Sequence, residues 1–290
     1  MATNEKSICV IGDSFAGNRN NAEWNKTDKR LNKDWSWVNL LEANNSGEFN
    51  GRSYPGQSYF HQRRWYYYNM IFHNEHDTSD TILVLVHTNH GRLPHMRDLP
   101  ITGQVVFADK HDPKSNELYK ADPSGRTFDF AHTFYLSQFY VDEFYFSAFT
   151  SWLAELPELT KHYKKVIHLF GFETKLNTLP NFMSRFYVGK LLTPNSVVVQ
   201  DTLVSLSMAE RGSREWGGPD VGPDRQNHFN KHNNECLFNE LTYIINNVPG
   251  GTFHKMDLSK WDLKDRSLLE TMKLYRDGFD PLDPVCNPLL

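Results

Sequence analysis

The chain has 290 residues, 39% of them hydrophobic and 23% charged, and its formal net charge is −4. This length suits one large domain, and the mildly acidic balance argues against a protein that binds nucleic acid by neutralising phosphates. No apolar run approaches the roughly 18 residues that a membrane span requires.

The cysteines and the N-terminal residues indicate the cellular compartment in which the protein is expected. The three cysteines are odd in number and widely separated, which is typical of free thiols in a reducing environment. The first residues lead into an apolar run with no signal-like segment before it. We therefore expect a cytoplasmic protein, and a virion assembled in a cytoplasm would show the same pattern.

Short apolar runs predict the strands of a parallel sheet. They are continuously apolar, as in strands that are buried on both faces, whereas half-exposed strands alternate between apolar and polar residues. Helical patterns separate the runs. The runs lie at residues 7–11, 81–87, 165–170 and 196–200, with a weaker one at 48–54. Strands that alternate with helices predict right-handed βαβ units. The expected fold is a three-layer α/β/α sandwich with a five-stranded parallel sheet, over residues 1–249.

Helical patterns fill the connections between these runs. The pattern at 35–44 has Asp34 as a possible N-cap, and that at 231–247 follows Asn230, another good capping residue. Two further patterns, at 58–73 and 129–156, are rich in aromatic residues.

Two segments fall outside this minimal sheet. Residues 93–127 are polar and too long for an ordinary connection, which predicts an insertion or lid. Residues 250–290 form a C-terminal extension, with a helix expected at 264–277, that packs on the domain or on a partner.

Polar residues follow several predicted strands at their carboxyl ends. Ser14 comes directly after the first strand, preceded by Gly12 and Asp13, as in hydrolases that present a nucleophile at the edge of a parallel sheet. Gly56 follows the second strand and Asn89 the third. In the loop before the last helix stands the segment that runs from Asp224 to His228.

These blocks resemble, in order and broad spacing, the SGNH (GDSL-type) serine hydrolase family. Gly12-Asp13-Ser14 matches the first block, Gly56 the glycine block, Asn89 the asparagine block and Asp224 with His228 the last block. The third block departs from the family's Gly-x-Asn-Asp. In the last block Asp224 stands four residues before His228 instead of three, so Asp220 is a second candidate for the acid.

The resemblance implies a flavodoxin-like fold and a serine esterase. His228 would remove the proton of Ser14, Asp224 would orient the imidazole, and the oxyanion hole would comprise the N–H groups of Ser14 and Gly56 and the side-chain amide of Asn89. Neither a cofactor nor a metal ion is expected. The residues expected near the substrate are Asp13, His90 and Arg92.

Each feature also has a structural interpretation. Gly12-Asp13-Ser14 could be a turn with Asp13 as a helix cap, and Gly56 and Asn89 could be turn formers. His87 and His90 suit polar neighbours of the site better than metal ligands. His228 and His232, four apart, have a spacing compatible with a metal site, but no third ligand is evident.

The aromatic helix at 129–156 suits core packing, with a second face left for the insertion, the extension or another subunit. The expected substrate is a short-chain ester, such as an O-acetyl group on carbohydrate. A lipase or thioesterase acting on longer acyl chains is the alternative enzyme, and an inactive SGNH-fold binding or structural module is the alternative from another class.

Overall fold

A parallel sheet forms the centre of the computed structural model, which describes residues 6–17, 34–53, 59–67, 78–88, 142–171, 189–213, 225–226 and 228–272. Within these parts the sheet has six strands in the order β2-β1-β3-β4-β5-β8, and every neighbouring pair is parallel. The first five follow the order 2-1-3-4-5 of flavodoxin-like doubly wound folds. The strands are β1 (Ser7–Gly12), β2 (Phe49–Ser53), β3 (Thr81–His87), β4 (Lys165–Phe170), β5 (Ser196–Thr202) and β8 (Thr252–His254).

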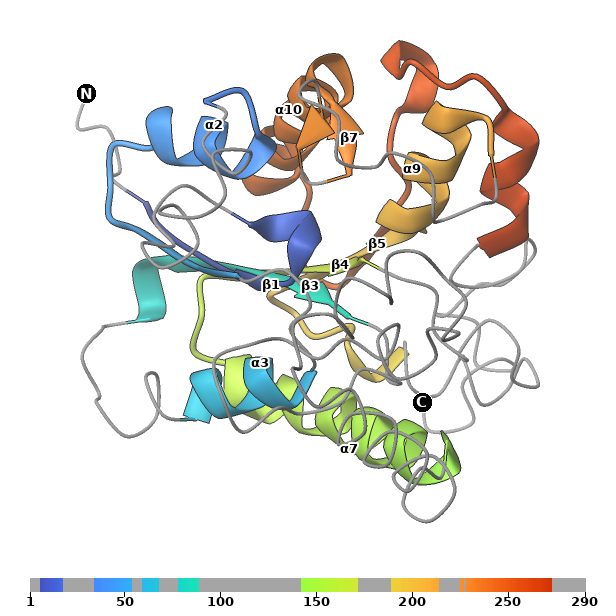
Figure 1. Ribbon diagram of the computed structural model, residues 1–290. Helices are drawn as coiled ribbons and strands as arrows, with labels where there is room; N and C mark the ends of the chain where they lie inside the picture. The colour runs from blue at the N-terminus through green and yellow to red at the C-terminus, as the bar shows by residue number, and fades with distance from the viewer. Residues whose placement is uncertain are drawn as a thin grey trace, which may run out of the picture.

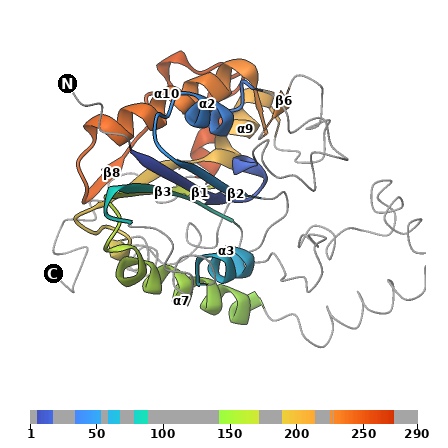
Figure 2. The same cartoon turned by 90° about the vertical axis from the view of Figure 1, so that its left-hand side faces the viewer.

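Helices cover both faces of the sheet (Figures 1 and 2). One face carries α2 (Trp37–Ala43), α9 (Leu203–Arg211) and α10 (Lys231–Asn247), and the other carries α3 (Tyr59–Trp65) and α7 (Asp142–Thr160). The three-layer α/β/α prediction is therefore confirmed.

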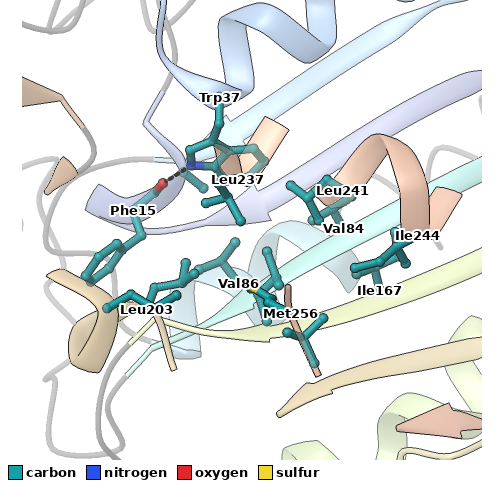
Figure 3. Close-up of a cluster of buried hydrophobic side chains, with 14 of the residues drawn as sticks. Phe15, Trp37, Val84, Val86, Ile167, Leu203, Leu237, Leu241, Ile244 and Met256 are labelled. Carbon is teal, nitrogen blue, oxygen red and sulfur yellow. Dashed lines mark hydrogen bonds between the residues drawn. The ribbon is translucent and has the colours of Figure 1, made fainter. Parts of the chain in front are cut away.

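Alternate residues of the central strands build two separate cores. In β3, Val84 and Val86 pack beneath α2, α9 and α10, whereas Leu83 and Leu85 pack against α3 and α7. Every residue of β3 is buried, as expected for a central parallel strand that is covered on both faces. Figure 3 shows the first of these cores, where side chains from α10 and α9 meet those of β3 and β4.

The helix starts test the two predicted caps. Asn230 caps α10 as predicted, because its Oδ1 accepts a hydrogen bond from the N–H of Asn233 at 2.8 Å. The prediction for Asp34 is wrong: the cap of α2 is Ser36, whose Oγ accepts from the N–H of Asn39 at 3.3 Å. Asp34 lies in a turn two residues earlier.

The sheet has one strand more than the five predicted, and the sixth comes from the segment assigned to the extension. β8 pairs with the edge strand β5. After it, the backbone N–H of Asp265 donates to the carbonyl of Ala209 in α9 at 3.0 Å. The helix expected at 264–277 is, over its described part, the 3-10 helix η7 (Arg266–Met272). The described part of the extension, residues 250–272, therefore continues the α/β unit.

Other predicted segments are described only in part. The aromatic pattern at 129–156 corresponds to α7 from residue 142 onward, where Phe149 and Trp152 are buried in the core. The insertion at 93–127 lies outside the described residues. Among the helices that the structure describes, none is both long and apolar enough to cross a membrane.

Candidate active site

The turn after β1 positions Ser14 at the carboxyl edge of the sheet. Ser14 is the first residue of a single 3-10 turn, η1 (Ser14–Ala16), and Asp13 caps that turn. The Asp13 carboxylate accepts a hydrogen bond from the N–H of Phe15 at 3.0 Å, and its carbonyl accepts from the N–H of Ala16 at 2.9 Å. Asp13 is fully buried. The structure thus gives Asp13 the capping role, and its contact with substrate stays a prediction.

Gly12 lets this turn pack tightly against the neighbouring strand. A Cβ atom added at Gly12 would lie 2.7 Å from the Cβ of Ala16 and 2.8 Å from the Cβ of Val86 in β3. Both distances are shorter than real Cβ contacts, so no side chain fits without a shift of the backbone. The glycine of the Gly-Asp-Ser motif therefore has a packing role of its own.

His228 lies in a tight hairpin before α10. The short strands β6 (Arg225–Gln226) and β7 (Phe229–Asn230) are antiparallel, with Gln226 opposite Phe229, so only two residues connect them. His228 has a φ of 66° and is the one non-glycine residue with positive φ in the described parts of the chain. Such turns require positive φ, which costs a non-glycine residue about 1–2 kcal/mol. Surrounding contacts must therefore hold the histidine in this conformation.

Helix α9 supplies part of that support. The Oγ of Ser207 donates to the carbonyl of His228 at 2.8 Å. The buried carboxylate of Glu210 accepts from the N–H of Asn230 at 3.1 and 3.2 Å and from the Nδ2 of Asn233 at 2.6 Å. Polar groups from one turn of α9 thus bond to the hairpin at His228 and Asn230 and to the first turn of α10 at Asn233.

The hairpin brings His228 next to the turn that contains Ser14. The half-buried imidazole of His228 lies with its centroid 4.4 Å from the ring of Phe15, at an interplanar angle of 42°. Phe15 follows Ser14 directly and also contacts Phe229, with the ring centroids 5.8 Å apart. Residues from the two ends of the predicted site therefore meet at the same edge of the sheet.

His87 belongs to a buried pair on the α3/α7 face. Its Nε2 lies 3.0 Å from the Nδ1 of His168 in β4, and the two rings stack with centroids 5.2 Å apart. Burial lowers the pKa of His168 to about 3, and burial together with His168 lowers the pKa of His87 well below its ordinary value. Both imidazoles are therefore neutral at physiological pH. His87 packs inside the protein as a structural neighbour of the strand end.

The second histidine of the possible metal pair has a different environment. The Nε2 of His232 lies 2.7 Å from the carbonyl oxygen of Lys260, and the Sγ of Cys236 lies 3.6 Å from the same nitrogen. No group of three or more histidine, cysteine, aspartate or glutamate side chains that could hold a metal ion occurs in the described part of the chain.

Several predicted site residues lie outside the described residues, and the roles given to them stay predictions. They are Gly56, Asn89, His90, Arg92, Asp220 and Asp224. For Ser14 the structure describes the backbone position. The hairpin contacts of Ser207 and Glu210 were not predicted, because nothing in the sequence of α9 marks which groups these two side chains will bond in the folded chain.

Comparison with known proteins adds one distant likeness. No family model and no curated protein matches the chain. A solved structure of a candidate GDSL-like lipase from Parabacteroides merdae has a TM-score of 0.27 and 14% identity over 60% of this chain. The chain spans 62% of that protein's length, less than two thirds. The flavodoxin-like class of the fold therefore rests on the strand order of this chain.

Proposed function

We propose that the protein is an SGNH-type serine hydrolase that cleaves carboxylic esters. The supporting observation is the contact of His228 with Phe15, the residue after Ser14, at the carboxyl end of β1. β2 is added on one side of β1 and β3 on the other, so the order in which strands join the sheet reverses at β1, and doubly wound proteins bind ligands at such a switch point. A serine and a histidine from distant segments at this position suit acyl transfer.

In the proposed mechanism His228 acts as general base and then as general acid. It accepts the Ser14 hydroxyl proton while the oxygen attacks the ester carbonyl, and it returns that proton to the leaving alcohol. Water, deprotonated by the same imidazole, then releases the acid from the acyl-enzyme. Asp224, or alternatively Asp220, would orient His228. The N–H groups of Ser14 and Gly56 and the Asn89 amide would bind the oxyanion.

We further propose a short acyl group, such as acetyl on a carbohydrate, as the substrate. Aromatic side chains often line sugar-binding clefts, but Phe149 and Trp152 of the aromatic helix are buried in the core. These two residues are therefore no evidence for a carbohydrate substrate. The esters compared below test the length of the acyl group.

The test compares hydrolysis of p-nitrophenyl acetate, butyrate and octanoate by the wild-type protein and by Ser14→Ala. Ser151→Ala is a matched control, because Ser151 is exposed on α7. We expect turnover of acetate above octanoate, a loss of about a thousandfold or more in Ser14→Ala and no loss in the control. Preference for octanoate would indicate the lipase or thioesterase alternative. Full activity in Ser14→Ala would refute the proposal, and an inactive wild type would favour the binding module.

A further inference from the structure

Two buried side chains connect the turn after β1 to the His228 hairpin. The indole Nε1 of Trp37 donates to the carbonyl of Phe15 at 2.7 Å (Figure 3). The backbone N–H of Trp37 donates to the Oδ1 of Asn234 at 3.1 Å. The Nδ2 of Asn234 in turn donates to the carbonyls of Phe229 at 3.2 Å and Asn230 at 3.0 Å.

The ends of this connection are the neighbours of the two proposed catalytic residues. Phe15 follows Ser14, and Phe229 follows His228. Trp37 comes from α2 and Asn234 from α10, so elements far apart in the sequence meet here. The connection therefore spans from the turn that carries the serine to the hairpin that carries the histidine.

The hydrogen bonds of this connection lie inside the protein, among apolar side chains. Trp37 and Asn234 are both fully buried, with exposures of 0%. A buried donor or acceptor left without a partner costs about 1–3 kcal/mol, so each hydrogen bond resists displacement. Hydrogen bonds are also directional, so they restrict the orientation of the groups that they join. The pair therefore restricts how the turn and the hairpin move relative to each other.

His228 has a strained backbone, so contacts from neighbouring elements must hold the hairpin in place relative to the turn after β1. Ser207 and Glu210 bond the hairpin to α9, and Trp37 with Asn234 bonds it to the turn after β1. A misplacement of reacting groups by about 1 Å can cost about a hundredfold in rate. We propose that Trp37 and Asn234 are positioning residues that set the placement of His228 relative to Ser14. The effect of this positioning on catalysis rests on the proposed esterase function.

The test removes the indole N–H and keeps an aromatic ring, with Trp37→Phe. Trp152→Phe is the matched control, because Trp152 is 1% exposed and packs in the other core, on the α3/α7 face. Asn234→Ala breaks the same connection at its other end and serves if Trp37→Phe does not fold. Urea unfolding measures the stability of each variant.

The first readout is the Cε1–H NMR resonance of His228, which senses the ring current of Phe15 at 4.4 Å. We expect this resonance to move in Trp37→Phe and Asn234→Ala and to stay in place in Trp152→Phe. An unmoved resonance in the first two variants would overturn the positioning role, whether or not the protein cleaves esters.

The second readout is kcat and KM for p-nitrophenyl acetate. We expect kcat to fall about tenfold or more in Trp37→Phe with KM little changed, and to change little in Trp152→Phe. Equal losses in the two variants at equal loss of stability would show a merely structural role and overturn the proposal. A moved resonance in a protein whose wild type is inactive would contradict the proposed function and support the connection.

Discussion

The imidazole of His228 lies 4.4 Å, centroid to centroid, from the ring of Phe15, the residue that follows Ser14. His228 reaches this position from a two-residue turn in which its own backbone has a positive φ of 66°. Positive φ is uncommon for residues other than glycine, and residues with such backbone angles cluster at active sites and ligand clamps.

The backbone of His228 predicts a difference between two inactive variants. His228→Gly and His228→Ala both remove the imidazole and its contact with Phe15, but only alanine retains the Cβ that disfavours positive φ. We expect His228→Gly to be more stable than His228→Ala by up to about 1 kcal/mol, because glycine adopts positive φ without strain. The greater entropy of glycine in the unfolded chain reduces this difference. Urea denaturation of the two variants measures the difference. A clearly more stable alanine variant would contradict the strained turn.

The Glu210 carboxylate predicts a large effect of a small change. Glu210→Gln keeps the shape but weakens the bonds from Asn230 and Asn233, because an amide is a poorer acceptor than a carboxylate and brings its own donors. We expect a loss of about 1.5–3 kcal/mol in unfolding free energy. Glu158→Gln, at an exposed site on α7, is the control and should cost clearly less, because an exposed ion pair adds little to stability. Similar losses in both variants would argue against the anchoring role.

Gly12 predicts a packing defect. In Gly12→Ala the new methyl group would lie 2.7 Å from Ala16 and 2.8 Å from Val86, so the turn must move away from β3. We expect a loss of about 1–3 kcal/mol in stability, measured by thermal unfolding, and reduced ester hydrolysis because Ser14 moves with the turn. Unchanged stability would show that the turn is looser than described.

The buried histidine pair predicts a dependence of stability on pH. In the folded state the pKa of His168 falls to about 3 and that of His87 also falls below its ordinary value of 6.5. The unfolded chain therefore binds protons at these sites, below about pH 6.5, that the folded chain does not bind. The contribution of the neutral pair to the free energy of unfolding should be complete above this pH and should be lost as the pH falls toward 3.

A variant isolates this contribution. His168→Gln should make the decline in unfolding free energy between pH 6.5 and 3 less steep, whatever its effect at neutral pH. His162→Gln, at an exposed position, is the control and should leave the slope close to that of the wild type. An unchanged slope in His168→Gln would mean that this imidazole already binds its proton in the folded state.

The sequence predicted the long, regular elements well. β3 at Thr81–His87, β4 at Lys165–Phe170 and α10 at Lys231–Asn247 have the expected bounds, because continuous burial or a strong cap marks their ends. The cap of α2 was misplaced because Asp34 and Ser36 are both good capping residues two positions apart.

The rest of the fold depended on tertiary partners. β6, β7 and β8 have two or three residues each, too few to show a period-2 pattern. The bonds of Trp37 to Phe15 and of Asn234 to Phe229 join residues whose proximity appears only after the sheet forms. Ser14 and His228 could be named from sequence blocks, but not the strained turn that holds the histidine.

The most direct test of the central claim is covalent labelling with a fluorophosphonate, followed by mass spectrometry of the digested protein. An activated serine gives its proton to the general base, attacks the phosphorus and displaces fluoride, which leaves a stable phosphonyl ester on the serine. We predict one modified residue, Ser14, and loss of the adduct in His228→Gly although that variant stays folded. An unlabelled wild-type protein, an adduct on another serine, or equal labelling without the imidazole would contradict a Ser14–His228 catalytic pair.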